Sequence, residues 1–227
     1  MRASIGLLIL ALTAAPAAAP LRVKASPAVA PCAAAAAQEY GRATGRAAAV
    51  ETAAIGMPES VAGADVVVAA DQELNRVIES GMTQPDQELD VAYVPWVLAG
   101  PAGSQAPSIQ SVGRGTQLVD VLGGVVARET WRRLAQQGMT PARAERGSRD
   151  GKEPREPVRL QPGEAAVVPL SLAGSASVTR LDVPPLRVRA LGVRASSRPD
   201  AAKAFLDFLA GERGGAAFRA CGRAEAR

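Results

Sequence analysis

The stretch Gly63–Gly81, GADVVVAADQELNRVIESG, predicts a strand followed directly by a helix. Its first half is a continuous apolar run bounded by turn residues, which is typical of a strand buried on both faces of a parallel sheet. Polar residues take over at Asp71, and Gln72–Ser80 is predicted to be a helix that ends at Gly81. A chain that repeats this strand–helix unit is expected to have an α/β fold.

Further strands and helices are predicted on both sides of this stretch. An Ala-rich helix begins at Pro31, runs through Tyr40 and ends near Gly45, which follows the usual preference for Pro at a helix start and Gly after its end. The other strand candidates are Leu21–Ala25, Val91–Pro101 with a bend or edge at Pro95, Gly163–Gly174 and Leu186–Ser196. Strands alternating with helices predict parallel sheets flanked by helices.

The closing stretch Arg198–Gly222, RPDAAKAFLDFLAGERGGAAFRACG, predicts two short helices. Pro199 and Asp200 suit the first turn of a helix, and Gly211 separates the two segments. All three phenylalanines of the chain fall in this stretch, so we expect it to pack into a core.

Two segments in the middle of the chain break the pattern. Residues 100–115 are rich in Gly, Pro, Ser and Gln, which indicates a loop or a lobe boundary, and the helix Val125–Gln137 is predicted after Gly123 and Gly124. Arg143–Pro162 is strongly charged and contains three prolines, so it cannot be one regular helix.

The composition argues against an enzyme. The 227 residues include no His and only two Cys, which removes the commonest general base and the usual zinc ligands. Strand alternation and helix capping explain Asp65, Asp71 and Glu73 without chemistry. The net charge is +4, but the arginines are scattered and not interleaved with aromatic residues, so nucleic-acid binding is not expected. No catalytic residue, metal or cofactor is predicted.

Residues 1–19 have the pattern of a secretory signal peptide. Arg2 precedes the apolar run Ile5–Leu12, and small residues follow, with cleavage expected near residues 17–19. The mature chain is therefore predicted to reach the periplasm. Export makes a disulfide possible, and Cys32 and Cys221 allow only one intramolecular bridge; two separate thiols are the alternative.

Six stretches carry a resemblance to a known family. They are LRVKASPAV, EYGRATG, GADVVVAADQELNRVIESG, GGVVARETWRRL, GEAAVVPLSLAGSASV and PDAAKAFLDFLAGERGGAAFRACG, in this order along the chain. Together they resemble the periplasmic molybdate-binding proteins of ABC transporters, a branch of the type 2 periplasmic solute-binding proteins. The resemblance implies two α/β lobes joined by two crossover strands, with residues 20–98 and 186–227 in lobe 1 and residues 99–185 in lobe 2.

The resemblance also implies a function and its partners. The chain would be the solute-binding component of an ABC importer, would bind a small anion such as molybdate or tungstate between its lobes, and would deliver it as a monomer to the membrane permease. A second hypothesis is a degenerate paralogue that keeps the fold and acts as an accessory or sensory partner without a small oxyanion.

The ligand positions of the family match this sequence poorly. The family's first hydroxyl residue falls on Ala28, with Ser26 two residues earlier, and its second serine falls in a turn that here reads TAAIGMPES. The two helix starts that would donate backbone N–H groups fall at the glycine pair 123–124 and near Glu153, and the family tyrosine maps to Ser171. The ligand-binding candidates are Ser26, Ala28, Ile55, Gly56, Gly123, Gly124 and Ser171.

Overall fold

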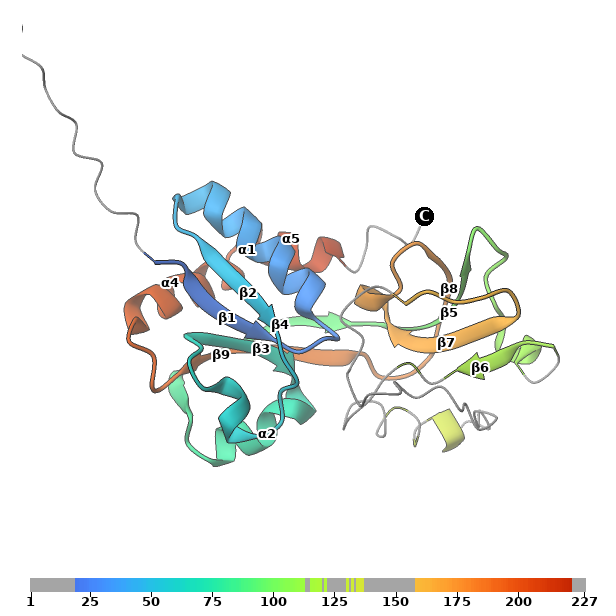
Figure 1. Cartoon of the computed structure of the whole chain (residues 1–227), viewed down its shortest axis with the longest axis horizontal. Coiled ribbons are helices and arrows are strands. Elements are labelled where there is room, and N and C mark those ends of the chain that lie inside the picture. The colour runs from blue at the N-terminus through green and yellow to red at the C-terminus, as the bar shows by residue number, and fades with distance from the viewer. Residues whose placement is uncertain are drawn as a thin grey trace, which may run out of the picture.

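The computed structural model describes residues 19–112, 115–119, 121, 130, 132, 134–136 and 158–221 (Figure 1). Two β-sheets lie side by side along the long axis of the molecule, and helices flank the first sheet. The α/β fold class predicted from the sequence is confirmed. In the described ranges, none of the helices is long and apolar enough to cross a lipid bilayer.

The first sheet has five strands in the spatial order β2-β1-β3-β9-β4. They are β1 (Leu21–Ala25), β2 (Ala48–Thr52), β3 (Val66–Ala70), β4 (Thr83–Val94) and β9 (Leu186–Val193). β1 runs parallel to β2 and β3, whereas β9 runs antiparallel to β3 and β4. The sheet is therefore mixed and not purely parallel as expected, because β9 enters from the second sheet and runs back against β3.

Helices cover both faces of the first sheet. One face carries α1 (Ala30–Thr44), α4 (Pro199–Ala210) and α5 (Glu212–Cys221), and the other carries α2 (Asp71–Glu79) (Figure 1). β3 is fully buried between them: its residues 66, 68 and 70 pack in the cluster that contains α1, and residues 67 and 69 pack with α2. Burial on both faces explains why this strand is a continuous apolar run.

The second sheet has the spatial order β6-β7-β5-β8. Its strands are β5 (Trp96–Ala102), β6 (Gln117–Val119), β7 (Glu164–Pro169) and β8 (Ala176–Arg180), and three short 3₁₀ turns of the chain are η1 (Pro58–Val61), η2 (Ile109–Ser111) and η3 (Leu170–Leu172). β6 and β7 are parallel, and β5 is antiparallel to β7 and β8.

Several expectations lie wholly or largely outside the described residues. They concern the signal peptide, Gly123 and Gly124, the helix Val125–Gln137 and the charged segment Arg143–Pro162. Within that helix, residues 130, 132 and 134–136 are described and are helical.

The chain passes between the two sheets at two places. On the outward path β4 ends at Val94 and β5 begins at Trp96, so the expected single strand Val91–Pro101 is two strands separated by Pro95. The return path is residues 181–185, between β8 and β9. The carbonyl of Pro95 accepts the N–H of Leu170 at 2.9 Å, which fixes the outward crossing to the second sheet.

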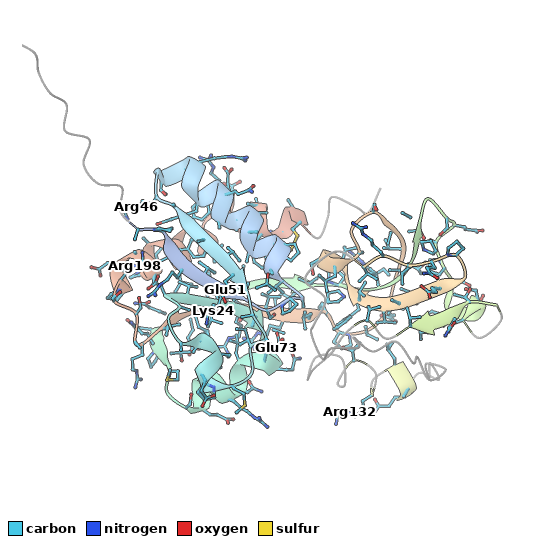
Figure 2. The ribbon with its side chains drawn as sticks, in the orientation of Figure 1. Lys24, Arg46, Glu51, Glu73, Arg132 and Arg198 are labelled. Atoms are coloured by element: carbon cyan, nitrogen blue, oxygen red, sulfur yellow. A yellow bond between two sulfur atoms is a disulfide. The ribbon has the colours of Figure 1, made fainter. Side chains whose placement is uncertain are left out.

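Asp65 joins three segments at the end of the first sheet that is remote from the second sheet. Its carboxylate accepts the backbone N–H of Arg22 in β1 at 2.8 Å and the hydroxyl of Ser196 at 2.8 Å. The guanidinium of Arg198, which is labelled in Figure 2, lies 2.5 Å from the same carboxylate. Burial alone would raise the pKa of Asp65, but the N–H of Arg22, the hydroxyl of Ser196 and the two nearby guanidinium groups together hold it below its usual value.

The phenylalanines of the closing stretch pack on α1, as the sequence predicts. The rings of Phe205 and Phe208 lie edge-on to Tyr40, with centroids 5.2 and 5.3 Å apart. Phe205 and Phe218 are fully buried. The two C-terminal helices therefore belong to the core of the first sheet and not to the second.

A disulfide fastens the two ends of this helical layer together. Cys32 in the first turn of α1 bonds to Cys221 at the end of α5, and their Cα atoms are 5.1 Å apart. Gly214 lets α5 approach α4 closely, because a Cβ atom at this position would clash with the carbonyl oxygen of Phe208. The bridge holds a ten-residue helix that is too short to be stable alone.

We predict that Asp65→Asn lowers the free energy of unfolding by about 2–3 kcal/mol, because an amide offers one acceptor oxygen where three donors converge. The lowered pKa of Asp65 in the folded state means that its stabilisation is complete above the unfolded value near 3.9 and is lost as the pH falls further. Urea titrations from pH 6 to 2.5 should show that the free energy of unfolding falls less with decreasing pH in Asp65→Asn than in the parent. Asp86→Asn, which removes an exposed charge of β4, is the control; an equal effect there would contradict the role of Asp65.

We also predict that the double variant Cys32→Ala, Cys221→Ala unfolds with about 2–4 kcal/mol less free energy, because the bridge constrains a loop with a sequence separation of 189 residues. Denaturant melts with and without dithiothreitol provide the test. Reductant should lower the midpoint of the parent and leave the double variant unchanged. Two free thiols in the denatured, unreduced parent would refute the bridge.

Candidate functional site

The candidate site lies at the carboxyl edge of the parallel strands β2, β1 and β3. These strands end at Thr52, Ala25 and Ala70, and the segments that follow them meet at the edge that faces the second sheet (Figure 1). Figure 2 shows Glu73, in the first turn of α2, nearer to the second sheet than Arg198. Open α/β sheets bind ligands at this edge, because helix starts and loop backbones converge there.

Ser26 directly follows β1 and is completely buried. Its backbone N–H donates to the carbonyl of Val68 at 3.0 Å, and its own carbonyl accepts the N–H groups of Val29 and Ala30 at 3.0 and 2.9 Å. Its hydroxyl oxygen has no hydrogen-bond partner in the described part of the chain. A buried hydroxyl without a partner is unusual in a folded protein and indicates a position that a ligand would satisfy.

Ala28 and Ser171 bring the two sheets into contact. The hydroxyl of Ser171, in η3, donates to the carbonyl of Ala28 at 2.5 Å, and both residues are buried. Ser171 was expected from the resemblance to take the family's tyrosine position, and the structure places it beside the loop after β1. In this arrangement its proton is already committed to a backbone carbonyl.

The loop after β2 supplies no side-chain donor at the predicted positions. Ile55 is buried and packs in the apolar cluster beneath α2. Gly56 has φ of 153°, a backbone conformation that other residues rarely adopt. Ile55 is thus a core residue, and only the backbone of this loop remains as a possible contact for a ligand. Gly123 and Gly124 lie outside the described residues.

The start of α2 contributes a second buried polar atom to the edge. The Oε1 atom of Gln72 is buried and has no hydrogen-bond partner among the described residues. Glu73 is buried too, and its carboxylate accepts the backbone N–H of Ala70 at 3.0 Å. Gln72 follows β3 as Ser26 follows β1, so two neighbouring strands each end in a polar group that lacks a protein partner.

Ion pairs offset the acidic charge of this edge. Arg189 lies 3.1 Å from Asp71, the first residue of α2, and also contacts Glu88. Arg187 forms two hydrogen bonds to Asp90, at 3.0 and 2.8 Å. These hydrogen bonds hold the pKa of Asp90 below its usual value, against the effect of burial. An anion near the start of α2 would therefore not meet an uncompensated Asp71.

The polar groups at this edge can bind a ligand. Within the described ranges, no group of three His, Cys, Asp or Glu side chains is placed to hold a metal ion. Among the described residues, the unpartnered buried atoms at this edge are neutral: the hydroxyl oxygen of Ser26 and the amide oxygen of Gln72. Neutral donors at helix starts are the usual ligands of a desolvated anion.

Comparison with known proteins identifies the fold. The periplasmic molybdate-binding protein of Azotobacter vinelandii superposes with a TM-score of 0.64 at 14% identity, covering 88% of this chain and 97% of that one. This chain has the type 2 periplasmic-binding-protein fold. A second match is PEB3 bound to L-phospholactate, with a TM-score of 0.60 and 10% identity, covering 89% of this chain and 98% of that one. A third is the sulfate-binding protein SubI of Mycobacterium tuberculosis, with a TM-score of 0.58 and 16% identity, covering 89% of this chain and 85% of that one.

Sequence comparison adds no family to this assignment. No protein-family model matches the chain, and no curated protein matches it. The type 2 periplasmic-binding-protein fold is thus established by structure, at identities too low to carry a ligand or a transported solute from one protein to another.

Gln72 and the arginines of β9 were not among the candidates from the sequence. The AADQ turn that follows β3 was noted as a resemblance, and the rule that ligands bind beyond the carboxyl ends of strands would have singled out Gln72. No local pattern would have found Arg187 and Arg189, because they reach the edge only through the antiparallel return of β9.

We predict that Ser171→Ala loosens the contact between the two sheets, since it leaves the buried carbonyl of Ala28 without its donor. The expected loss is about 1–2 kcal/mol in unfolding free energy, together with a larger radius of gyration by small-angle scattering. Thr179→Val is the matched control, because it removes a hydroxyl-to-carbonyl bond, to Pro107, within the second sheet and its loop. If the two variants have the same radius of gyration, the Ser171 contact does not hold the sheets together.

Proposed function

We propose that this chain is the exported solute-binding component of an ABC importer, with a small oxyanion of the molybdate and tungstate class as its ligand. The ligand would lie between the two sheets, at the carboxyl edge formed by the ends of β1 and β3. Binding would be by neutral donors, without a metal, a cofactor or a covalent step.

The unpartnered hydroxyl of Ser26 carries the proposal. Ser26 is completely buried at the edge where this fold holds ligands, and its hydroxyl lacks a protein partner. A buried polar group left unpaired costs about 1–3 kcal/mol, a cost that a ligand oxygen would remove. One strand away, the Oε1 atom of Gln72 is also buried without a partner among the described residues, but an amide oxygen is an acceptor, so it would pair with a protonated ligand oxygen and not with an anionic one.

Structural relatives bind anions of this size. They include a molybdate-binding protein, PEB3 bound to L-phospholactate and a sulfate-binding protein, so the fold accommodates inorganic oxyanions and a small organic phosphate. All of these ligands carry several oxygen atoms that can accept hydrogen bonds. Selection among them depends on cavity size and on the number of donors, which here are fewer than the family pattern supplies.

The proposal includes the path of the chain and its partners. Residues 1–19 would direct export to the periplasm and be removed near residues 17–19. Residues 20–98 with 186–227 would form one lobe and residues 99–185 the other, and closure of the lobes over the anion would present the monomer to the membrane permease.

One specific observation favours the alternative, an accessory or sensory protein without a small oxyanion. The hydroxyl of Ser171 is already bonded to Ala28, and the loop after β2 offers Ile55 and Gly56 where the family has a serine. Such a protein would keep the two sheets in contact in the absence of any ligand.

The test is the thermal midpoint of the mature protein with millimolar molybdate, tungstate, sulfate or phosphate. A ligand that binds only the folded state raises the midpoint by mass action, so at least one of these anions should raise it by several degrees. Ser26→Ala should weaken this ligand at least tenfold while leaving the unliganded midpoint unchanged or higher, because it removes a buried polar group that had no partner.

Ser80→Ala is the control for this test, since its hydroxyl donates to the carbonyl of Val77 at the end of α2 that is remote from the candidate site. It should bind the anion as the parent does. No stabilisation by any of the four anions would exclude the oxyanion hypothesis and favour the accessory protein. If Ser26→Ala is stabilised by the anion as much as the parent is, the anion does not bind at Ser26.

A further inference from the structure

A cavity lies where the outward crossing meets the C-terminal helix. This hinge pocket has a volume of about 190 Å³ and is lined by Cys32, Ala92, Tyr93, Val94, Pro95, Arg180, Phe218 and Arg219. It shares none of its residues with the candidate site at Ser26, Ala28 and Ser171. β4, β8, α1 and α5 each contribute to its lining.

The charge of the hinge pocket has one sign. Arg180 and Arg219 are the only charged residues among the described residues that line it. Neither side chain forms an ion pair or a hydrogen bond with another residue in the described part of the chain. The other arginines near the crossing, Arg187 and Arg189, are both paired with carboxylates. Two unpaired guanidinium groups on one cavity favour an anionic ligand, and their planar donor geometry suits a carboxylate.

The rest of the lining is apolar and rigid. Cys32 and Phe218 are each 1% exposed, and Val94 is 5% exposed, so they form a floor that belongs to the core. The disulfide to Cys221 fixes Cys32 to the end of α5. Tyr93 is 60% exposed and stands at the rim. Apolar walls with a few convergent polar groups are the usual make-up of a small-molecule site.

From its size, charge and lining, we infer that the hinge pocket binds a small organic carboxylate with an apolar body. The carboxylate pairs with Arg180 and Arg219, and the apolar body lies against Phe218 and Val94. Its volume of about 190 Å³ is below the roughly 300–1,000 Å³ of pockets for drug-sized ligands, so the ligand is of the size of a substituted benzoate or a short fatty acid.

The two arginines of the hinge pocket belong to different parts of the fold. Arg180 ends the last strand of the second sheet, and Arg219 lies in the helix that packs on the first sheet. A carboxylate held by both arginines would therefore connect the second sheet to the helical layer of the first sheet, next to Pro95, where the chain crosses between the sheets.

The test is the affinity of the mature protein for benzoate, measured by isothermal titration calorimetry beside acetate and benzyl alcohol. Acetate has the carboxylate without the apolar ring, and benzyl alcohol has the ring without the charge. Both should bind at least tenfold more weakly than benzoate. Arg180→Gln and Arg219→Gln should each weaken benzoate at least tenfold, which corresponds to about 1.4 kcal/mol.

Two further variants make the result specific. Arg46→Gln removes an exposed arginine at the far end of the first sheet (Figure 2) and should leave benzoate binding unchanged. Ala92→Leu fills the pocket floor and should weaken benzoate without changing the fold, as circular dichroism checks.

The outcomes separate this inference from the proposed function. Ser26→Ala, which alters only the oxyanion site, should keep the benzoate affinity of the parent. The inference is overturned if benzoate does not bind, if acetate binds as tightly as benzoate, or if Arg46→Gln weakens benzoate as much as Arg180→Gln does. Binding that both pocket arginine variants retain also overturns it.

Discussion

The position of β9 is the constraint on which the rest of this structure depends. This strand comes after the whole second sheet in sequence, yet it lies between β3 and β4 in the middle of the first sheet. Without it, β3 and β4 have no contact through the sheet, and α4 and α5, which follow it, have no place on α1. Neither the first sheet nor its helical layer is therefore complete without residues 186–221, which the chain reaches only after it has formed the second sheet.

The two ends of the first sheet carry different sets of buried polar groups. At the end remote from the second sheet, the carboxylate of Asp65 connects β1 to the segment after β9, because it accepts hydrogen bonds from Arg22, Ser196 and Arg198. At the opposite end, the groups that follow β1 and β3 include two buried polar atoms, on Ser26 and Gln72, that have no partner among the described residues. A third such atom, the Oε1 of Gln87, lies against Gly192 near the Asp65 end, so unpartnered atoms are not confined to the end where binding is proposed.

The sequence was a good guide to elements whose signals are local. The apolar run of β3, the helix start at Pro31 and the apolar face around Phe205 each depend on neighbouring residues, and the structure has these elements within a few residues of the prediction. The direction of β9 was not predictable in this way, because a strand's sequence does not state which neighbour it joins. Because β9 joins β3 and β4 in the antiparallel direction, the first sheet is mixed.

Prediction of the candidate site was weaker for the same reason. The family position at Ala28 and the tyrosine position at Ser171 could be counted along the chain, but their mutual hydrogen bond depends on the packing of two sheets. Ser26 was considered only as a substitute for Ala28, and it is the residue with the unpartnered hydroxyl. Whether a polar atom is satisfied is a property of the folded packing and not of residue type.

The two crossings also set the kind of motion that is open to this molecule. One connection is a single proline with its φ angle fixed by the ring, and the other is the five residues 181–185. On either side of them the strands are paired, Val94 with Leu186 and Val97 with Arg180. Two attachment points define an axis, so the sheets have one soft degree of freedom, a bend about that line, and twisting them apart would break strand pairing.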